Sequence, residues 1–290
     1  MSGSEPAPAK INLCLHVTGQ RSDGYHLLDS LVVFAGVGDT VSARKMQGLS
    51  LSVTGPEGAG LSPGADNLVL RAARLMGARD LALTLDKVLP LASGIGGGSS
   101  DAAACLRLLS RLQGMALPAP NVVLALGADV PVCLQATPCR MRGIGEEITP
   151  LPPLPRFWMV LVNPRCEVAT PQVFRTLRAR DNAPMPEQLP EWADASSFFD
   201  WVAQQRNDLE APALQIAPVI GHVLNVLGAT QGCALARMSG SGATCFGLFG
   251  DQTDAEAAAR NINAAFPAWW CEATACAPVP MGNQYSRATT

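Results

Sequence analysis

Residues 94–100, Gly-Ile-Gly-Gly-Gly-Ser-Ser, are the segment of this chain whose residue types best suit the binding of a phosphate group. An extended apolar stretch precedes this glycine loop and an amphipathic stretch follows it, so backbone N–H groups converge there with the positive end of a predicted helix. No lysine follows the glycines as in a Walker loop, and the third glycine of a dinucleotide-binding fingerprint is missing. Composition alone would also allow a flexible linker, which does not usually stand between a strand and a capped helix. The sequence therefore predicts a phosphate loop of another kind.

Four other segments carry side chains that could take part in chemistry. They are Lys10 with Asn12, Tyr25 with His26, Asp129, and the turn that holds Gly240 and Gly242. Each has an ordinary structural explanation: a solvated strand end, a packed turn, a helix cap and a hairpin turn, respectively. An aromatic ring beside an imidazole also suits a nucleobase, through stacking and hydrogen bonds to the base edge. Their joint occurrence with the glycine loop favours one site over four unrelated turns.

The first half of the chain alternates between strand and helix patterns. Apolar residues at every second position predict strands over residues 11–17 and 81–86, and shorter patterns add strands over 31–35, 40–43 and 49–53. Apolar residues three and four positions apart predict a helix from Asp101 to Gly114, with Ser99 or Ser100 as its N-cap. A second helix is expected over residues 67–76.

The second half of the chain is typical of a small antiparallel sheet backed by helices. Strands are expected over residues 157–162, 233–238, 245–249 and 269–273, and helices near 218–227 and 253–265. Thr170 is predicted to cap a helix with Pro171 at its first position, and Thr253 with Glu256 predicts a capping box. Four prolines within residues 149–156 predict a domain boundary, which gives domains over 1–152 and 153–290.

Composition argues against several classes of protein. The chain has 290 residues, 48% of them hydrophobic, and a net charge of −3, which gives no general attraction to polyanions or anionic membranes. No apolar run is long enough to span a bilayer, and residues 1–9 lack the features of a secretion signal. Nine cysteines without any C-x-x-C pair favour buried free thiols. We therefore expect a cytoplasmic protein that binds neither nucleic acid nor membranes.

Taken together, the motifs resemble those of the GHMP small-molecule kinases. Residues 90–104 are similar to the signature loop of that family, and residues 239–243 are similar to its C-terminal glycine motif. The resemblance covers most of the chain. It implies a two-domain α+β fold, with a mixed α/β N-terminal domain and a ferredoxin-like C-terminal domain, and it implies ATP and Mg²⁺ as cofactors.

Three segments resemble one branch of the family more closely: residues 8–15, 21–26 and 127–131. The substrate of that branch is a cytidine diphosphate conjugate of methylerythritol, an intermediate of non-mevalonate isoprenoid synthesis. The resemblance implies that Asp129 is the general base for its 2-hydroxyl group, and that Lys10 orients this carboxylate and favours developing negative charge. Such positioning and charge neutralisation are what phosphoryl transfer needs.

The same resemblance assigns binding roles to the other candidates. Tyr25 and Phe174 are expected to sandwich the cytosine, His26 to bind its polar edge and Asn12 to contact the substrate near the reacting hydroxyl. Gly240 and Gly242 are expected to border the substrate's phosphates. The ATP phosphates are expected over Gly94, Gly96, Gly97, Gly98, Ser99 and Ser100, with Asn67 near the adenine or ribose. The resemblance gives no metal ligand, and it leaves a monomer or weak homodimer as the expected assembly.

Some residues depart from the family pattern, and alternatives remain. The glycine loop differs from the family pattern at Leu91, Ala92, Ser93 and Ile95, and we expect these changes to alter the affinity for ATP. Arg140 and Arg142 also depart from the pattern, and the sequence offers no explanation for them. Another GHMP kinase, acting on homoserine, mevalonate or a sugar, is a second hypothesis, although those substrates offer no base to stack. A hydrolase motif at residues 60–64 fails because Pro63 has no N–H for an oxyanion hole. A catalytically inactive nucleotide-binding regulator would have no use for a general base.

Overall fold

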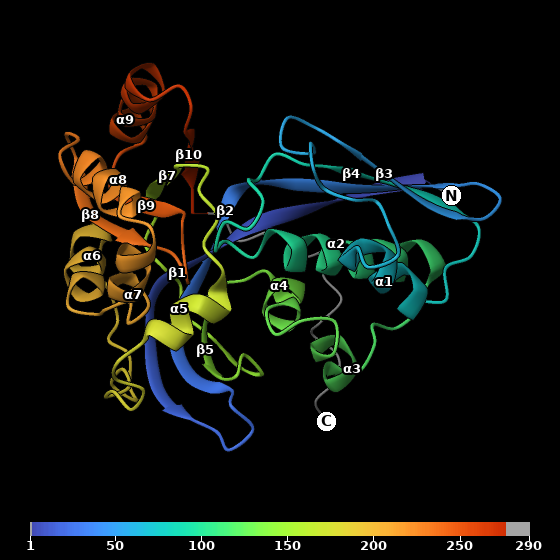
Figure 1. Ribbon diagram of the computed structural model, residues 1–290, viewed down its shortest axis with the longest axis horizontal. Coiled ribbons are helices and arrows are strands. Elements are labelled where there is room, and N and C mark those ends of the chain that lie inside the picture. Colours follow the sequence, from blue (N-terminus) through green and yellow to red (C-terminus); the bar gives the residue numbers. More distant parts are fainter. Residues whose placement is uncertain (1, 277–290) are drawn as a thin grey trace.

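The computed structural model describes residues 2–276, and a long antiparallel hairpin runs through its centre (Figure 1). Strands β1 (Ser2–Gln20) and β2 (His26–Lys45) pair over nearly their whole length. Their register shifts at three places, between Pro8 and Lys10, between Asn12 and Cys14, and between Val17 and Gly19. Such irregularities re-aim side chains, and two of them fall beside candidate site residues.

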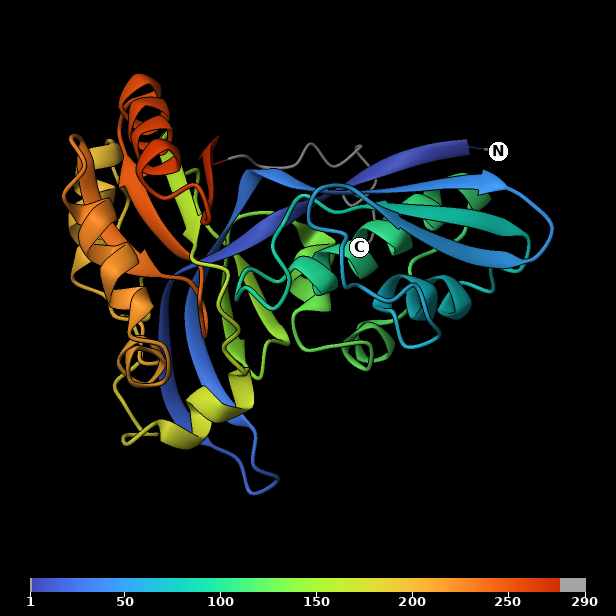
Figure 2. The same ribbon diagram turned by 45° about the horizontal axis from the view of Figure 1, so that its top comes forward.

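The first sheet extends from this hairpin. Its order is β3-β4-β2-β5-β6, with β1 also paired to β2. The added strands are β3 (Leu49–Thr54), β4 (Leu81–Asp86), β5 (Cys139–Gly143) and β6 (Glu147–Pro150). Its helices are α1 (Leu68–Leu75), α2 (Gly97–Gln113), α3 (Pro120–Leu124) and α4 (Val130–Gln135), which lie together on one side of the sheet (Figure 2). One core joins the two layers, with Phe34 and Leu85 packed with Leu106 and Leu109.

The second sheet has the order β10-β7-β9-β8 and is antiparallel throughout. Its strands are β7 (Trp158–Asn163), β8 (Cys233–Met238), β9 (Cys245–Phe249) and β10 (Trp270–Ala275). The helices of this half are α5 (Thr170–Thr176), α6 (Ala195–Ala203), α7 (Glu210–Ile216), α8 (Val219–Gly228) and α9 (Gln252–Ala265). A separate apolar cluster joins Met159 and Phe246 of this sheet to Ile11 and Val33 of the hairpin. The hairpin is therefore part of the cores of both halves.

The predicted strands of the first half are present, but the hairpin is longer than its pattern suggested. The expected strands 31–35 and 40–43 are parts of the single strand β2. Gly38 explains why the pattern is interrupted, because a Cβ there would lie 2.4 Å from the Ala7 backbone oxygen. The glycine thus permits a close approach of the two strands, where the sequence suggested a break.

Three predicted helix starts are wrong by a few residues. Helix α2 begins at Gly97 with Gly96 as its N-cap, so neither Ser99 nor Ser100 caps it. Gly96 has a φ of 65°, and this left-handed residue turns the chain into the helix without a side-chain cap. Ala169 precedes α5 in place of Thr170, and Asp251 caps α9 in place of the box expected from Thr253. The predicted end of α2 at Gly114 is confirmed.

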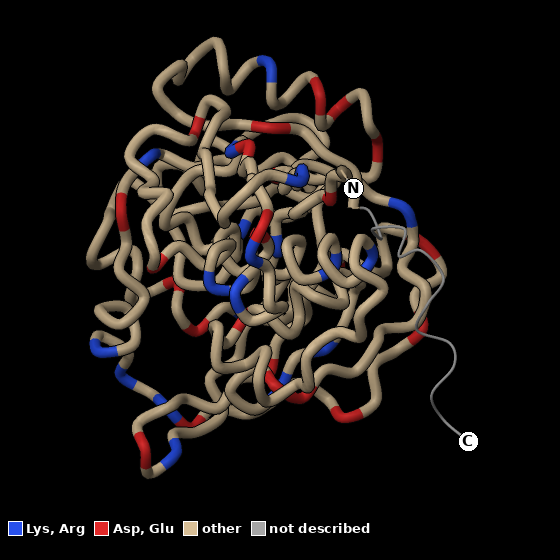
Figure 3. Tube along the Cα trace, turned by 90° about the vertical axis from the view of Figure 1, so that its right-hand side faces the viewer, with Lys and Arg blue, Asp and Glu red and all other residues tan. Residues whose placement is uncertain are grey.

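The two arginines without an explanation in the sequence hold a distant segment in place. Arg140 on β5 makes two hydrogen bonds to Asp29 on β2, at 2.8 and 2.7 Å, and donates to the backbone oxygens of Met185, Pro186 and Glu187. Arg142 donates to the Glu187 carboxylate. Figure 3 shows basic residues mixed with acidic ones along the chain trace, in keeping with such pairing.

Composition also gave expectations about the cysteines and about membrane-spanning segments. All nine cysteines fall within the described residues, and all are free thiols. No helix among residues 2–276 is long and apolar enough to cross a bilayer.

Candidate active site

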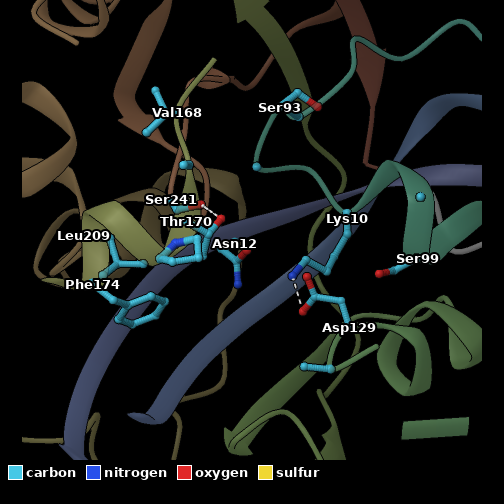
Figure 4. A pocket seen from close by; sticks show the side chains of 18 of the residues that line it. Lys10, Asn12, Ser93, Ser99, Asp129, Val168, Thr170, Phe174, Leu209 and Ser241 are labelled. Atoms are coloured by element: carbon cyan, nitrogen blue, oxygen red, sulfur yellow. Dashed lines mark hydrogen bonds and ion pairs between the residues drawn. The ribbon is translucent and has the colours of Figure 1, made fainter. Parts of the chain in front are cut away.

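A cavity of about 1050 Å³ opens where the hairpin, the glycine loop, α4, α5 and the 239–242 turn meet (Figure 4). A volume of this size suits two small-molecule substrates side by side. Most of the predicted site residues line it: Lys10, Asn12, Tyr25, His26, Gly94, Gly96, Gly97, Gly98, Ser99, Asp129, Phe174 and Gly240. Asn67, Ser100 and Gly242 are not among its lining residues.

Lys10 and Asp129 form an ion pair in the wall of this cavity. Lys10 Nζ lies 2.8 Å from Asp129 Oδ1, and the two side chains are 5% and 37% exposed. The lysine follows a register shift in β1, and its backbone N–H donates to the Ile95 oxygen at 2.9 Å. A Cβ at Gly96 would lie only 3.2 Å from Lys10 Cβ. A buried cation held in this way fixes the carboxylate, whose exposed part faces the cavity.

The start of α2 presents backbone N–H groups without acceptors in the helix, as the sequence predicted for the end of the glycine loop. Gly97, Gly98 and Ser99 are its first residues, and their N–H groups have no acceptor within the helix. These donors and the helix dipole favour an anion at this end. Ser100 has a structural role, because its hydroxyl is buried and donates a hydrogen bond to the Pro8 backbone oxygen at 2.8 Å. It anchors the helix to β1.

The glycine loop and the 239–242 turn touch each other backbone to backbone. Gly94 has a φ of 73°, and a Cβ there would lie 2.5 Å from the Gly242 oxygen. Ser239 Oγ accepts from the Asn12 N–H at 3.1 Å and donates to the Gly94 oxygen at 3.3 Å. Gly242 thus supports the loop from behind, while Gly240 faces the cavity. A side chain at Gly94 or at Gly240 would separate the two segments, because a Cβ on Gly240 would lie 2.9 Å from the Gly94 oxygen.

Hydrogen bonds from three further side chains, none of them predicted as a site residue, also hold the 239–242 turn. The hydroxyls of Thr170 and Ser241 lie 2.7 Å apart and join the first residue of α5 to the turn. Asn207 donates to the backbone oxygens of Met238 and Gly240, at 2.9 and 2.8 Å. Thr170 stood out only as an expected helix cap, and nothing in the local sequence pairs it with Ser241.

An aromatic pocket forms the far end of the cavity. The rings of His26 and Phe174 stack with their centroids 4.5 Å apart and their planes at 22°. Tyr25 is 58% exposed at the rim. His26 Nε2 is buried without a hydrogen-bond partner among residues 2–276. Burial, and then the charge of Arg180, lower the pKa of His26, which keeps the imidazole neutral and its free nitrogen available to a ligand.

A buried cluster of charges lies beneath the glycine loop. Lys87 Nζ contacts Asp39 Oδ2 at 2.5 Å and Asp101 Oδ2 at 3.1 Å, and a Cβ at Gly97 would lie 3.4 Å from the same Nζ. Burial raises the pKa of Asp101 to about 8, against the opposing charge of Lys87 and with the help of the Asp39 charge. The sequence placed Asp101 only in a helix turn, and it gave no sign of Lys87.

Asn67 acts as a helix cap in this structure. Its Oδ1 accepts from the Val69 N–H and its Nδ2 donates to the Ser62 oxygen, both at 3.0 Å. Both groups of the amide are therefore engaged within the chain, and a contact between Asn67 and a nucleotide stays a prediction.

Comparisons with known proteins identify the family of this chain. The family model "GHMP kinases N terminal domain" matches residues 67–139, and "GHMP kinases C terminal" matches residues 191–268. The chain is 59% identical over 265 residues, 91% of its length and 95% of the relative's, to a 4-diphosphocytidyl-2-C-methyl-D-erythritol kinase of Cereibacter sphaeroides. This chain belongs to the same GHMP kinase family.

Other kinases are similar to this chain to different degrees. The relative from Ruegeria pomeroyi is 57% identical over 268 residues, covering 91% of this chain and 96% of its own. The crystal structure of a 4-(cytidine 5'-diphospho)-2C-methyl-D-erythritol kinase has a TM-score of 0.77 and 33% identity, covering 95% of this chain and all of that one. The mevalonate kinase of L. major, at 15% identity and a TM-score of 0.66, shares the fold. The predicted two-part GHMP kinase fold is confirmed.

Proposed function

We propose that this chain transfers the γ-phosphoryl group of ATP to the 2-hydroxyl of 4-diphosphocytidyl-2-C-methyl-D-erythritol, giving the 2-phosphate and ADP in non-mevalonate isoprenoid precursor synthesis. The observation that carries the proposal is the position of the Lys10–Asp129 pair. It opens on one cavity that has the glycine loop on one side and the aromatic pocket on the other. A phosphoryl donor and a base-bearing acceptor can therefore meet at the carboxylate.

The glycine loop is the proposed site of the ATP phosphates. Membership of a kinase family implies ATP, and the unpaired N–H groups of residues 97–99 fit an anion held by the backbone. No group of three or more His, Cys, Asp or Glu side chains among residues 2–276 could hold a metal ion. The protein ligands of Mg²⁺ therefore stay unassigned in this proposal.

Asp129 and Lys10 act on the acceptor hydroxyl in this proposal. The carboxylate oxygen that is not paired with Lys10 accepts the hydroxyl proton and points the oxygen towards the γ-phosphorus. A carboxylate is a weak base for an alcohol, so the proton moves late and orientation carries much of the effect. The ammonium group, 2.8 Å from the carboxylate, neutralises charge that develops on the attacking oxygen.

The aromatic pocket is the proposed cytosine site. Tyr25 and Phe174 offer ring faces to the base, and the free Nε2 of the neutral His26 offers one hydrogen bond to its edge. In the structure His26 covers one face of Phe174, so the imidazole must turn aside for a base to lie between Tyr25 and Phe174. Gly240 and the turn around it border the path of the diphosphate.

A kinase for homoserine or mevalonate is the second candidate, because such enzymes share the fold. The aromatic pocket disfavours it, since neither substrate has a base to stack.

We further propose a cytoplasmic monomer or weak homodimer, with the domain boundary near residue 152. The assay is ADP release by the purified chain with Mg-ATP, measured by a coupled enzyme reaction. Turnover of the cytidylyl substrate is expected, and turnover of only homoserine or mevalonate would reject the assignment.

A further inference from the structure

Asn12 presents a buried polar atom that the chain leaves without a partner. The residue is 1% exposed, and its Oδ1 has no hydrogen-bond partner among residues 2–276. In Figure 4 its side chain lies between the Lys10–Asp129 pair and the Thr170–Ser241 pair. An acceptor buried without a donor is costly, which indicates that a ligand supplies the donor.

The other end of the Asn12 amide is held by Ser30 on β2. Asn12 Nδ2 donates to Ser30 Oγ at 2.7 Å, and Ser30 Oγ donates to the Cys14 backbone oxygen at 2.6 Å. Ser30 is fully buried, and Asn12 and Cys14 flank a register shift in β1. This short chain of hydrogen bonds runs from the cavity into the sheet.

The direction of these hydrogen bonds fixes the orientation of the amide. A backbone oxygen can only accept, so the single hydroxyl hydrogen of Ser30 is used on Cys14. Ser30 must then accept from Asn12, which requires the NH₂ group on that side. The amide oxygen is consequently turned to the cavity, where it accepts hydrogen bonds and repels phosphate oxygens.

We propose that Ser30 is a positioning residue, which locks Asn12 so that its Oδ1 accepts a hydrogen bond from a hydroxyl of the acceptor substrate that does not react. The reacting 2-hydroxyl has one hydrogen, and the proposed function assigns that hydrogen to Asp129. The donor to Asn12 is therefore the neighbouring 1-hydroxyl or 3-hydroxyl. The inference rests on the proposed function and adds how the polyol end of the substrate is selected.

The experiment compares kcat/KM for the full substrate with kcat/KM for its 1-deoxy and 3-deoxy analogues. The wild type is expected to disfavour one analogue by about 10- to 100-fold, the effect of leaving one buried acceptor without its donor. Ser30→Ala frees the amide to turn, so this ratio should fall to within about threefold. Ser30→Thr retains the hydroxyl and should retain the discrimination.

A double-mutant cycle separates positioning from a general structural role. Adding Ser30→Ala to Asn12→Ala should cost little further kcat/KM, because the serine then has no amide to orient. Losses that multiply, or an unchanged ratio in Ser30→Ala, would overturn the inference. Asn12→Ala alone should also lose the discrimination, and this second test does not depend on Ser30→Ala folding. A wild type that ignores the full substrate would instead reject the proposed function.

Discussion

Gly96→Ala tests whether the glycine loop also sets the position of Lys10, the lysine of the proposed catalytic pair. Gly96 has a φ of 65°, a conformation that costs an L-residue roughly 1–2 kcal/mol. The added methyl would lie 3.2 Å from Lys10 Cβ and 3.5 Å from Lys10 Cε. The 3.2 Å contact with Cβ is short enough to displace Lys10 by a few tenths of an ångström, so both stability and turnover should fall.

The size of the turnover effect follows from the displacement. A misplacement of about 1 Å can cost ~10²-fold in rate, so a shift of a few tenths should lower kcat by about tenfold. Gly114→Ala is the matched control, because Gly114 has the same φ of 65° and a Cβ there would meet nothing within 4 Å. The control should lose a similar free energy of unfolding and keep its kcat.

Two measurements check this prediction: coupled ADP release for kcat, and urea unfolding for stability. Equal losses of kcat in Gly96→Ala and Gly114→Ala would show that backbone strain alone explains the effect. A wild-type kcat in Gly96→Ala would refute the contact between the loop and Lys10 as a determinant of catalysis.

Two further predictions concern the buried charges and the aromatic pocket. Because the pKa of Asp101 is raised from 3.8 to about 8, the folded chain holds a proton there that the unfolded chain releases, so stability should fall as pH rises from about 4 to 8. Urea unfolding at pH 5 and 7.5 should show a smaller fall for Asp101→Asn, and an identical fall would contradict the raised pKa. Tyr25→Ala should weaken substrate binding by about 1–3 kcal/mol through lost stacking and leave the KM for ATP unchanged. An unchanged KM for the cytidylyl substrate would rule out stacking by Tyr25.

Local patterns predicted several helices and strands, because the spacing of their apolar residues matches the period of the element. The stripe of Ala102, Cys105 and Leu109 is fully buried, and strands β8 and β9 fall on the residues that were predicted as strands, 233–238 and 245–249. Helices α6 and α7 were not predicted, since their short apolar patterns are ambiguous between helix and loop. Sequence spacing also misled where a glycine replaced the usual side-chain cap, as at Gly96.

The contacts that complete the site join residues far apart in the chain, and no local pattern contains them. Thr170 and Ser241 are 71 positions apart, and Lys87 and Asp39 are 48. The resemblance to the kinase family supplied the closeness of Lys10 to Asp129, which spacing alone could not give. Ser30 is the clearest example of a residue that sequence patterns could not identify, because its proposed role depends on the directions of the hydrogen bonds around it.

The kcat of Asp129→Asn tests the central claim most directly. The amide keeps the size of the side chain and its place beside Lys10 but cannot accept a proton, so kcat should fall by about 10²–10⁴-fold. ATP binding, measured by calorimetry on the same variant, should stay close to the wild-type value. A variant that retains full kcat with the cytidylyl substrate would contradict the account and place the base elsewhere.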